Sequence, residues 1–120
     1  MNDSQLIEAY KAYLKSFNAH SITEIEACLA PDCCAEYNGK VVCHNRTEML
    51  PTYLAHWEKI TAPIELLEIL PIESGVWVKL RSPDDRKDYE VEYYYNKEGL
   101  QDRHVIQKVE AWDETDQAEQ

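Results

Sequence analysis

Apolar side chains recur at spacings of three and four residues in three segments of the first half of the chain. The three stripes are Leu6, Tyr10, Tyr13, Leu14 and Phe17; Ile22, Ile25, Cys28 and Leu29; and Met49, Leu50, Tyr53, Leu54, Trp57 and Ile60. This spacing places the side chains of each stripe on one face of a helix. Ser21 with Glu24, and Asn45 with Glu48, have the spacing of capping boxes ahead of the second and third helices.

The second half of the chain is typical of strands. Residues 75–82 and 88–96 alternate between the two faces of a strand, which predicts two strands with one buried face each. Residues 62–74 are apolar without clean alternation and indicate a strand that has a bulge or is covered on both faces. Residues 103–112 form the last long strand. The turn clusters "SPDDRK" and "NKEG" favour antiparallel pairing of consecutive strands.

Helices followed by a strand meander are typical of an α+β protein, in which helices cover one face of an antiparallel sheet. A chain of 120 residues is expected to form one domain. We predict that this domain spans 1–112, because 113–120 loses the apolar periodicity and becomes an acidic tail.

The segment "CCAEYNGKVVCHNR", residues 33–46, is the richest in candidate chemistry. The Asn-Gly pair at its centre predicts a hairpin with a two-residue turn. The register of that hairpin sets Cys34 opposite Cys43 and puts His44 on the same face as Tyr37. The hairpin therefore determines which of these groups can meet.

Three other uses of this hairpin stay open. The candidate zinc ligands are Cys33, Cys34, Cys43 and His44, but adjacent strand residues point to opposite faces and do not chelate one ion easily. Cys34 and Cys43 are candidates for a cross-strand disulfide, and Cys33 with His44 for a nucleophile pair. In a reducing compartment, small buried thiols are the favoured interpretation. We expect no metal and no organic cofactor.

The net charge and the hydropathy of the chain argue against several classes of function. The formal net charge of −11 argues against binding to nucleic acid or to an anionic membrane surface. The N-terminal segment lacks the basic and apolar regions of a signal peptide, and no run approaches the ~20 apolar residues of a membrane span. We therefore expect a cytoplasmic protein with reduced cysteines.

Three local motifs carry a resemblance to a known superfamily. They are "YLKSFNAHSITEIEACLAPD", "EYNGK" and "CHNRTEM". In their order and spacing, residues 4–112 resemble the nuclear transport factor 2-like superfamily, which includes SnoaL-like cyclases and ketosteroid isomerases. The resemblance implies a cystatin-like α+β cone, with three N-terminal helices packed on a curled antiparallel sheet around a mostly apolar cavity.

The ketosteroid isomerases of this superfamily suggest roles for individual residues. Tyr13 matches a tyrosine on the first helix that donates to the developing oxyanion, and Tyr53 matches a supporting tyrosine on the third helix. The two hydroxyls are therefore expected within hydrogen-bond distance of each other or of one shared group. Tyr37 stands at the position where these isomerases have the catalytic aspartate, and Val91 stands where they have a protonated acid. Because both carboxylates are replaced, ketosteroid isomerisation is not expected. His44 is the best remaining base.

Further side chains complete the predicted pocket. Those expected to line it are Tyr37, Trp57, Val91 and Tyr93. His56, three residues after Tyr53, is a candidate for the rim, with a solvated histidine as the alternative. The alternative is that the tyrosines are core aromatics whose hydroxyls are satisfied locally, and that His44 is a solvated residue ahead of a helix.

The opposite face of the sheet is predicted to meet a partner. Four large side chains stand there among charged residues: Trp77, Tyr94, Ile106 and Trp112. Apolar groups among charges on an outer face suggest an interaction surface. The resemblance implies a homodimer through this face.

Together these features predict a cone domain with a tyrosine-lined pocket for a small apolar or aromatic organic molecule. If the protein is an enzyme, cofactor-free isomerase, cyclase or lyase chemistry is expected. The alternative is a non-catalytic ligand-binding or protein-interaction domain. A carboxylate or histidine within hydrogen-bond reach of Tyr13 favours the enzyme, and an all-apolar pocket favours the binder.

Overall fold

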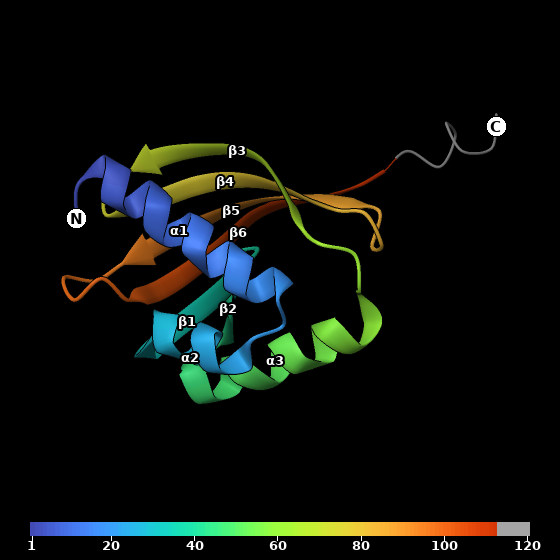
Figure 1. The fold of residues 1–120 in the computed structure, drawn as a ribbon, viewed down its shortest axis with the longest axis horizontal. Coiled ribbons are helices and arrows are strands. Elements are labelled where there is room, and N and C mark those ends of the chain that lie inside the picture. Colours follow the sequence, from blue (N-terminus) through green and yellow to red (C-terminus); the bar gives the residue numbers. More distant parts are fainter. Residues whose placement is uncertain (113–120) are drawn as a thin grey trace, which may run out of the picture.

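The computed structural model describes residues 1–112 as three helices and one six-stranded sheet (Figure 1). The helices are α1 (Asp3–Asn18), α2 (Ile22–Cys28) and α3 (Arg46–Lys59), and the strands are β1 (Leu29–Tyr37), β2 (Lys40–Cys43), β3 (Glu65–Ile72), β4 (Gly75–Ser82), β5 (Lys87–Tyr95) and β6 (Gln101–Ala111). The predicted α+β class, with three N-terminal helices on a curled sheet, is confirmed. The predicted acidic tail, 113–120, lies outside the described residues.

Each helix begins at a side chain that satisfies backbone N–H groups the helix cannot satisfy itself. Asn2 caps α1, Ser21 caps α2 and Asn45 caps α3, so the two caps predicted from capping-box spacing are confirmed. In the part of the chain that the structure describes, no helix combines the length and apolar character needed to cross a membrane.

The strands lie in the order β2-β1-β6-β5-β4-β3. Strands joined by short turns pair antiparallel, as those turns predict, but β1 runs parallel to β6. No turn joins these two strands, so no local signal could define their relative direction. In Figure 1, α1 lies across the sheet, whereas α2 and α3 lie beside β1 and β2. The core fills the space between them.

The alternation predicted for β4 and β5 is confirmed. The inward side chains are buried, and they are Val76, Val78, Leu80, Val91, Tyr93 and Tyr95. Because successive side chains point to opposite faces of a strand, every second residue of β4 and β5 faces the helices.

The last strand departs from simple alternation because it contains two bulges. Its register with β5 skips Asp102 and then Gln107. Each skipped residue reverses which side chains face the core. As a result His104 and Ile106 face inward between the bulges, and Gln101 faces inward before the first one. The prediction that Ile106 belongs to the outer partner surface is therefore wrong.

The two-residue turn at Asn38-Gly39 is confirmed, with positive φ at both residues, which is typical of the tight turns of hairpins. The predicted pairing of Tyr37 with Lys40 is confirmed, but the predicted register fails beyond Val41. A bulge at Val42 shifts the pairing, so that Ala35 and not Cys34 faces Cys43. The cross-strand Cys34–Cys43 pair expected from the sequence does not form.

Gly75 begins β4 at a point where its backbone lies directly against β5. A Cβ atom at this position would stand 2.2 Å from the backbone oxygen of Tyr93. We expect Gly75→Ala to lower the free energy of unfolding by about 2 kcal/mol, because relief requires a shift of the strand backbone. Gly39→Asn is the control, since its surroundings are open and Asn tolerates positive φ. Urea denaturation checks both, and equal losses would contradict the prediction.

Candidate functional site

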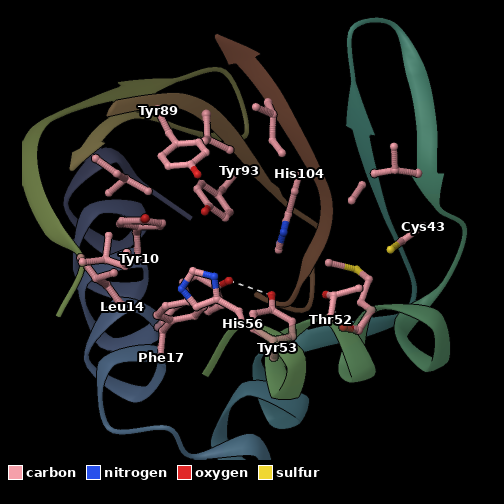
Figure 2. A pocket seen from close by; sticks show the side chains of 18 residues that line it. Tyr10, Leu14, Phe17, Cys43, Thr52, Tyr53, His56, Tyr89, Tyr93 and His104 are labelled. Carbon is pink, nitrogen blue, oxygen red and sulfur yellow. Dashed lines mark hydrogen bonds between the residues drawn. The ribbon is translucent and has the colours of Figure 1, made fainter. Parts of the chain in front are cut away.

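A cavity of about 370 Å³ lies between α1, α3 and the inner face of the sheet (Figure 2). Its lining residues are Tyr10, Tyr13, Leu14, Phe17, Ala35, Val42, Cys43, Met49, Thr52, Tyr53, His56, Ile64, Leu80, Tyr89, Val91, Tyr93, His104 and Ile106. A volume of this size is in the range of pockets for small organic molecules.

Among residues 1–112, no Asp, Glu, Lys or Arg side chain lines the cavity. Its polar groups are tyrosine and threonine hydroxyls, one thiol and two imidazoles. An ion would lose its hydration here without gaining a counter-charge, which is unfavourable. The wall therefore suits an uncharged molecule.

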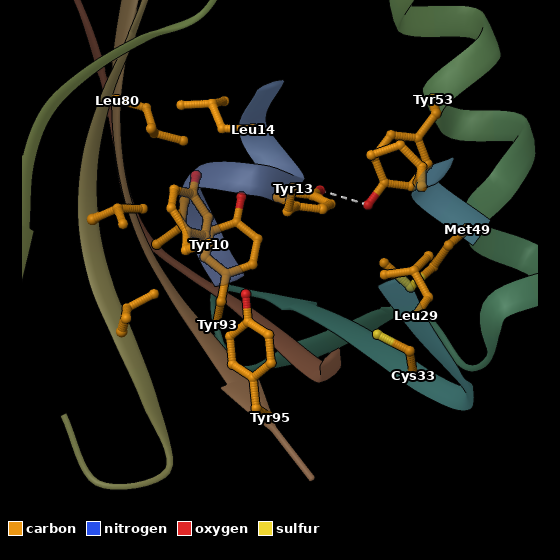
Figure 3. Packing of buried hydrophobic residues seen from close by; sticks show 14 of the residues in the cluster. Tyr10, Tyr13, Leu14, Leu29, Cys33, Met49, Tyr53, Leu80, Tyr93 and Tyr95 are labelled. Atoms are coloured by element: carbon orange, nitrogen blue, oxygen red, sulfur yellow. Dashed lines mark hydrogen bonds between the residues drawn. The ribbon is translucent and has the colours of Figure 1, made fainter. Parts of the chain in front are cut away.

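The hydroxyls of Tyr13 and Tyr53 form a buried hydrogen bond of 2.7 Å. The two rings approach each other from α1 and from α3 (Figure 3). Each tyrosine occupies the apolar stripe of its helix, so packing the two helices over the sheet brings the hydroxyls together. The prediction that these hydroxyls lie within hydrogen-bond distance is confirmed.

Burial raises the pKa of the phenols in the wall. The pKa values of Tyr10, Tyr13 and Tyr53 lie well above the ordinary value, and that of Tyr93 is raised to about 12. Desolvation of the phenolate is the main cause in each case. All four hydroxyls therefore keep their protons at neutral pH and are able to donate hydrogen bonds.

The hydroxyl of Tyr10 is buried and has no hydrogen-bond partner among residues 1–112. Its ring centroid lies 4.7 Å from that of Tyr93 and 5.7 Å from that of Tyr13. A buried polar group without a partner costs about 1–3 kcal/mol. Tyr10 therefore marks a point where a polar group inside the cavity would gain a hydrogen bond.

His104 was missed by the sequence analysis. Strict alternation along the last strand would place it on the outer face, and the bulge at Gln107 turns it inward. Its side chain is 7% exposed, and its Nε2 lies 2.6 Å from Oε1 of Gln101. Burial lowers the pKa of His104 to about 3, so the ring is neutral. The only signal in the sequence was Ile106, an aliphatic residue on a face otherwise occupied by charges.

His56 lines the cavity from α3, three residues after Tyr53. Its Nε2 is buried without a hydrogen-bond partner among the described residues. Burial lowers the pKa of His56, and the carboxylate of Asp85 acts in the opposite direction. Of the two alternatives for His56, the structure shows the one at the pocket.

Comparison with known proteins identifies the architecture. No family model and no curated protein matches the sequence. Among solved structures, a SnoaL-like protein of unknown function from Burkholderia thailandensis has a TM-score of 0.77 at 10% identity, covering 88% of this chain and 96% of its own. The epoxide hydrolase/cyclase-like enzyme SalBIII, of pyran ring formation in the polyether salinomycin, has a TM-score of 0.74 at 16% identity, with 92% and 98% covered.

A third similar structure is the NTF-2 like protein of unknown function from Burkholderia xenovorans. Its TM-score is 0.73 at 12% identity, covering 92% of this chain and 87% of that one. This chain has the nuclear transport factor 2-like, SnoaL-like cone fold. At these identities the similarity establishes the fold alone.

Within the cone fold, four of the predicted site residues line the cavity: Tyr13, Tyr53, Val91 and Tyr93. Val91 occupies the position that the resemblance assigned to a protonated acid, and its aliphatic side chain leaves that part of the wall apolar.

The predicted placement of His44 at the pocket is wrong. Its side chain is 71% exposed, and its Nδ1 pairs with Oε1 of Glu48 at 3.0 Å. The backbone N–H of His44 donates to the same oxygen. His44 follows β2 directly and belongs to the N-terminal cap of α3, so it cannot serve as a base for a molecule in the cavity.

Tyr37 and Trp57 also lie outside the cavity wall, contrary to prediction. Tyr37 ends β1 next to the hairpin turn and is 39% exposed, because this end of the strand extends beyond the cavity. Trp57 lies four residues after Tyr53, which rotates it toward the end of α1. There it stacks on His20 at 5.1 Å and contacts the ring of Phe17 at 5.7 Å.

The four cysteines are free thiols. Burial raises the pKa of Cys33 to about 12 and raises those of Cys28 and Cys43 as well. Thiols of this kind are poor nucleophiles at neutral pH. Residues 1–112 contain no group of three or more His, Cys, Asp or Glu side chains arranged to hold a metal ion.

The Tyr13–Tyr53 bond can be measured with a double-mutant cycle. Each single change to Phe leaves one buried hydroxyl unpaired and is expected to cost about 1–2 kcal/mol of unfolding free energy. The double variant should lose less than the sum by about 1 kcal/mol. Tyr13→Phe combined with Tyr94→Phe is the additive control, because the Tyr94 hydroxyl bonds to Glu92. Additivity of the first pair in denaturant titrations would contradict this coupling.

Burial of His104 predicts an acid-sensitive stability. The unfolded chain binds a proton near pH 6.5, whereas the folded pKa is about 3. Between these two values the unfolded state holds the extra proton, so the free energy of unfolding falls as the pH is lowered, by up to about 1.4 kcal/mol per pH unit. His104→Phe should weaken this slope between pH 6.5 and 5, whereas the exposed control His44→Phe should retain it. Denaturant titrations at several pH values decide between these outcomes.

Proposed function

We propose that this protein binds a small, uncharged, apolar or aromatic organic molecule in the cavity and acts on it as a cofactor-free isomerase, cyclase or lyase. The observation that carries the proposal is the Tyr13–Tyr53 hydroxyl pair, which stands inside a cavity without charged walls. Reactions of these classes that pass through an enolate or alkoxide develop negative charge on an oxygen, and such an oxygen needs a hydrogen-bond donor in a dry site.

The pair suits that task because the two hydroxyls act together. When one phenol donates to another, the accepting phenol still has its own proton to donate. We assign Tyr53 as the donor to Tyr13, so that Tyr13 donates to an oxygen of the ligand. A hydroxyl that accepts one hydrogen bond donates a stronger one. One donor to an oxyanion typically contributes a factor of about 10² to 10³ in rate.

The electrostatics of the molecule support a neutral ligand. The formal net charge of −11 repels anions from the surface. Inside, the protonated phenols and the neutral imidazoles of His56 and His104 offer hydrogen bonds without a full charge. The aliphatic part of the wall, including Leu14, Leu80 and Val91, suits a hydrocarbon skeleton.

A non-catalytic ligand-binding domain is the second candidate. It is favoured by one specific observation, which is that no carboxylate of residues 1–112 lines the cavity. The cavity therefore lacks one of the side-chain types that abstract a proton from carbon.

The ionisation of bound 2-naphthol distinguishes the two candidates. A hydrogen bond to a naphtholate oxygen lowers the pKa of the bound molecule relative to the same pocket without that donor. We expect the pKa of bound 2-naphthol, followed by absorbance, to be lower in wild type than in Tyr13→Phe by about one unit or more. Tyr94→Phe, on the outer face, is the control and should match wild type. Equal pKa values in wild type and Tyr13→Phe would favour the binder, and absence of binding would contradict both candidates.

We also propose that the protein is cytoplasmic and that it forms a homodimer through the outer face of the sheet. On this face the hydroxyl of Tyr94 donates to Glu92, and the guanidinium groups of Arg81 and Arg86 lie over the ring of Trp112. These contacts hold two of the large outer side chains in defined positions, as a recurrent interface would require.

A further inference from the structure

We infer that His104 is a fixed hydrogen-bond acceptor in the cavity, and that the site therefore selects ligands that carry a hydroxyl or N–H group in addition to an oxygen for Tyr13. The inference deepens the proposed function and rests on it for the identity of the cavity as a ligand site. It names the substrate class as uncharged, hydroxylated carbonyl compounds.

The orientation of the imidazole is set by a buried chain of side chains. Nε2 of His104 lies 2.6 Å from Oε1 of Gln101, and Nε2 of Gln101 donates to the hydroxyl of Tyr95 at 2.9 Å. Gln101 is fully buried. A separation of 2.6 Å is too short for a nitrogen–nitrogen hydrogen bond, so the carbonyl oxygen of Gln101 faces the ring. Nε2 of His104 therefore carries the proton.

A neutral imidazole has one protonated nitrogen and one lone pair. Because Nε2 is protonated, the lone pair is on Nδ1, which has no hydrogen-bond partner among residues 1–112. The side chain is 7% exposed and lines the cavity. Figure 2 shows the ring projecting from β6 into the cavity.

Two tyrosine rings restrict the motion of this imidazole. The ring of Tyr93 meets it edge-on at a centroid distance of 4.6 Å, and the ring of Tyr13 does so at 6.0 Å. With Gln101 on one nitrogen and these rings beside it, His104 cannot turn its N–H toward the cavity without breaking a buried hydrogen bond. The low pKa of His104 keeps the lone pair available throughout the neutral range.

This lone pair differs chemically from the hydroxyl groups of the wall. A tyrosine hydroxyl pairs with either an acceptor or a donor, because it rotates and holds both a proton and lone pairs. Nδ1 of His104 pairs with a donor alone. A carbonyl or ether oxygen placed against it leaves two desolvated acceptors facing each other, which is costly in a buried site. The site therefore discriminates between a hydroxyl compound and its methyl ether.

The test compares 6-hydroxy-2-acetylnaphthalene with 6-methoxy-2-acetylnaphthalene. Both have the ketone oxygen for Tyr13, and only the first has a donor for His104. We expect the hydroxy ketone to bind wild type at least about tenfold more tightly in calorimetric titration. This preference should disappear in His104→Phe and weaken in Gln101→Leu. The controls His44→Phe and Gln107→Leu change the same residue types outside the cavity and should retain it.

A second measurement needs no ligand. In protein labelled with nitrogen-15 at histidine, the shifts of His104 should show a protonated Nε2 and an unprotonated Nδ1, and Gln101→Leu should disturb this tautomer while Gln107→Leu should not. The opposite tautomer in wild type would overturn the inference and leave the 2-naphthol test of the Tyr13 donor unaffected. Equal affinity for the two ketones would also overturn it, with ligand binding intact. Failure of both ketones to bind would overturn the assigned ligand class.

Discussion

The shape of the cavity depends on two extra residues in β6, Asp102 and Gln107. A bulge bends the strand that contains it and increases the local twist, so two bulges in the strand that joins β1 to β5 curl the sheet around its inner face. The same bulges reverse the alternation of side chains. His104 and Gln101 thereby both point toward the helices. In a strand without the bulge at Asp102, residues three apart would point to opposite faces, and one of the two would face solvent.

The interior of this cone buries the rings of several tyrosines. Tyr10, Tyr13, Tyr53 and Tyr93 are all at most 8% exposed. Burying polar groups is costly unless they form hydrogen bonds. The Tyr13–Tyr53 bond satisfies two hydroxyls within the wall, while Tyr10 and His56 retain polar atoms without partners in the described chain. A core selected for stability alone would replace such groups with phenylalanine or leucine, so their presence supports a function in binding.

The comparisons and the geometry answer different questions. Structures that resemble this one at 10–16% identity define the arrangement of helices and sheet. They include an enzyme and proteins of unknown function, so the fold does not determine the chemistry. The side chains of this cavity indicate the kind of ligand that it binds. Here an uncharged wall combines a pair of phenol donors with an imidazole acceptor, where the ketosteroid isomerases it resembles use two carboxylates.

The sequence by itself determined the helices and the strands of the second half. These elements follow from local periodicity, because a helical stripe or an alternating strand must turn its apolar face to the core. The Tyr13–Tyr53 pair was expected from the resemblance to the ketosteroid isomerases, together with the places of both residues on apolar stripes. The parallel pairing of β1 with β6, the inward position of His104 and the outward positions of His44 and Tyr37 were decided by tertiary structure. A bulge moves the register by one residue and inverts every side chain beyond it, and no short stretch of sequence records that shift. Only the pairing of complete strands, under the packed helices, selects which of the two faces becomes the wall of the cavity.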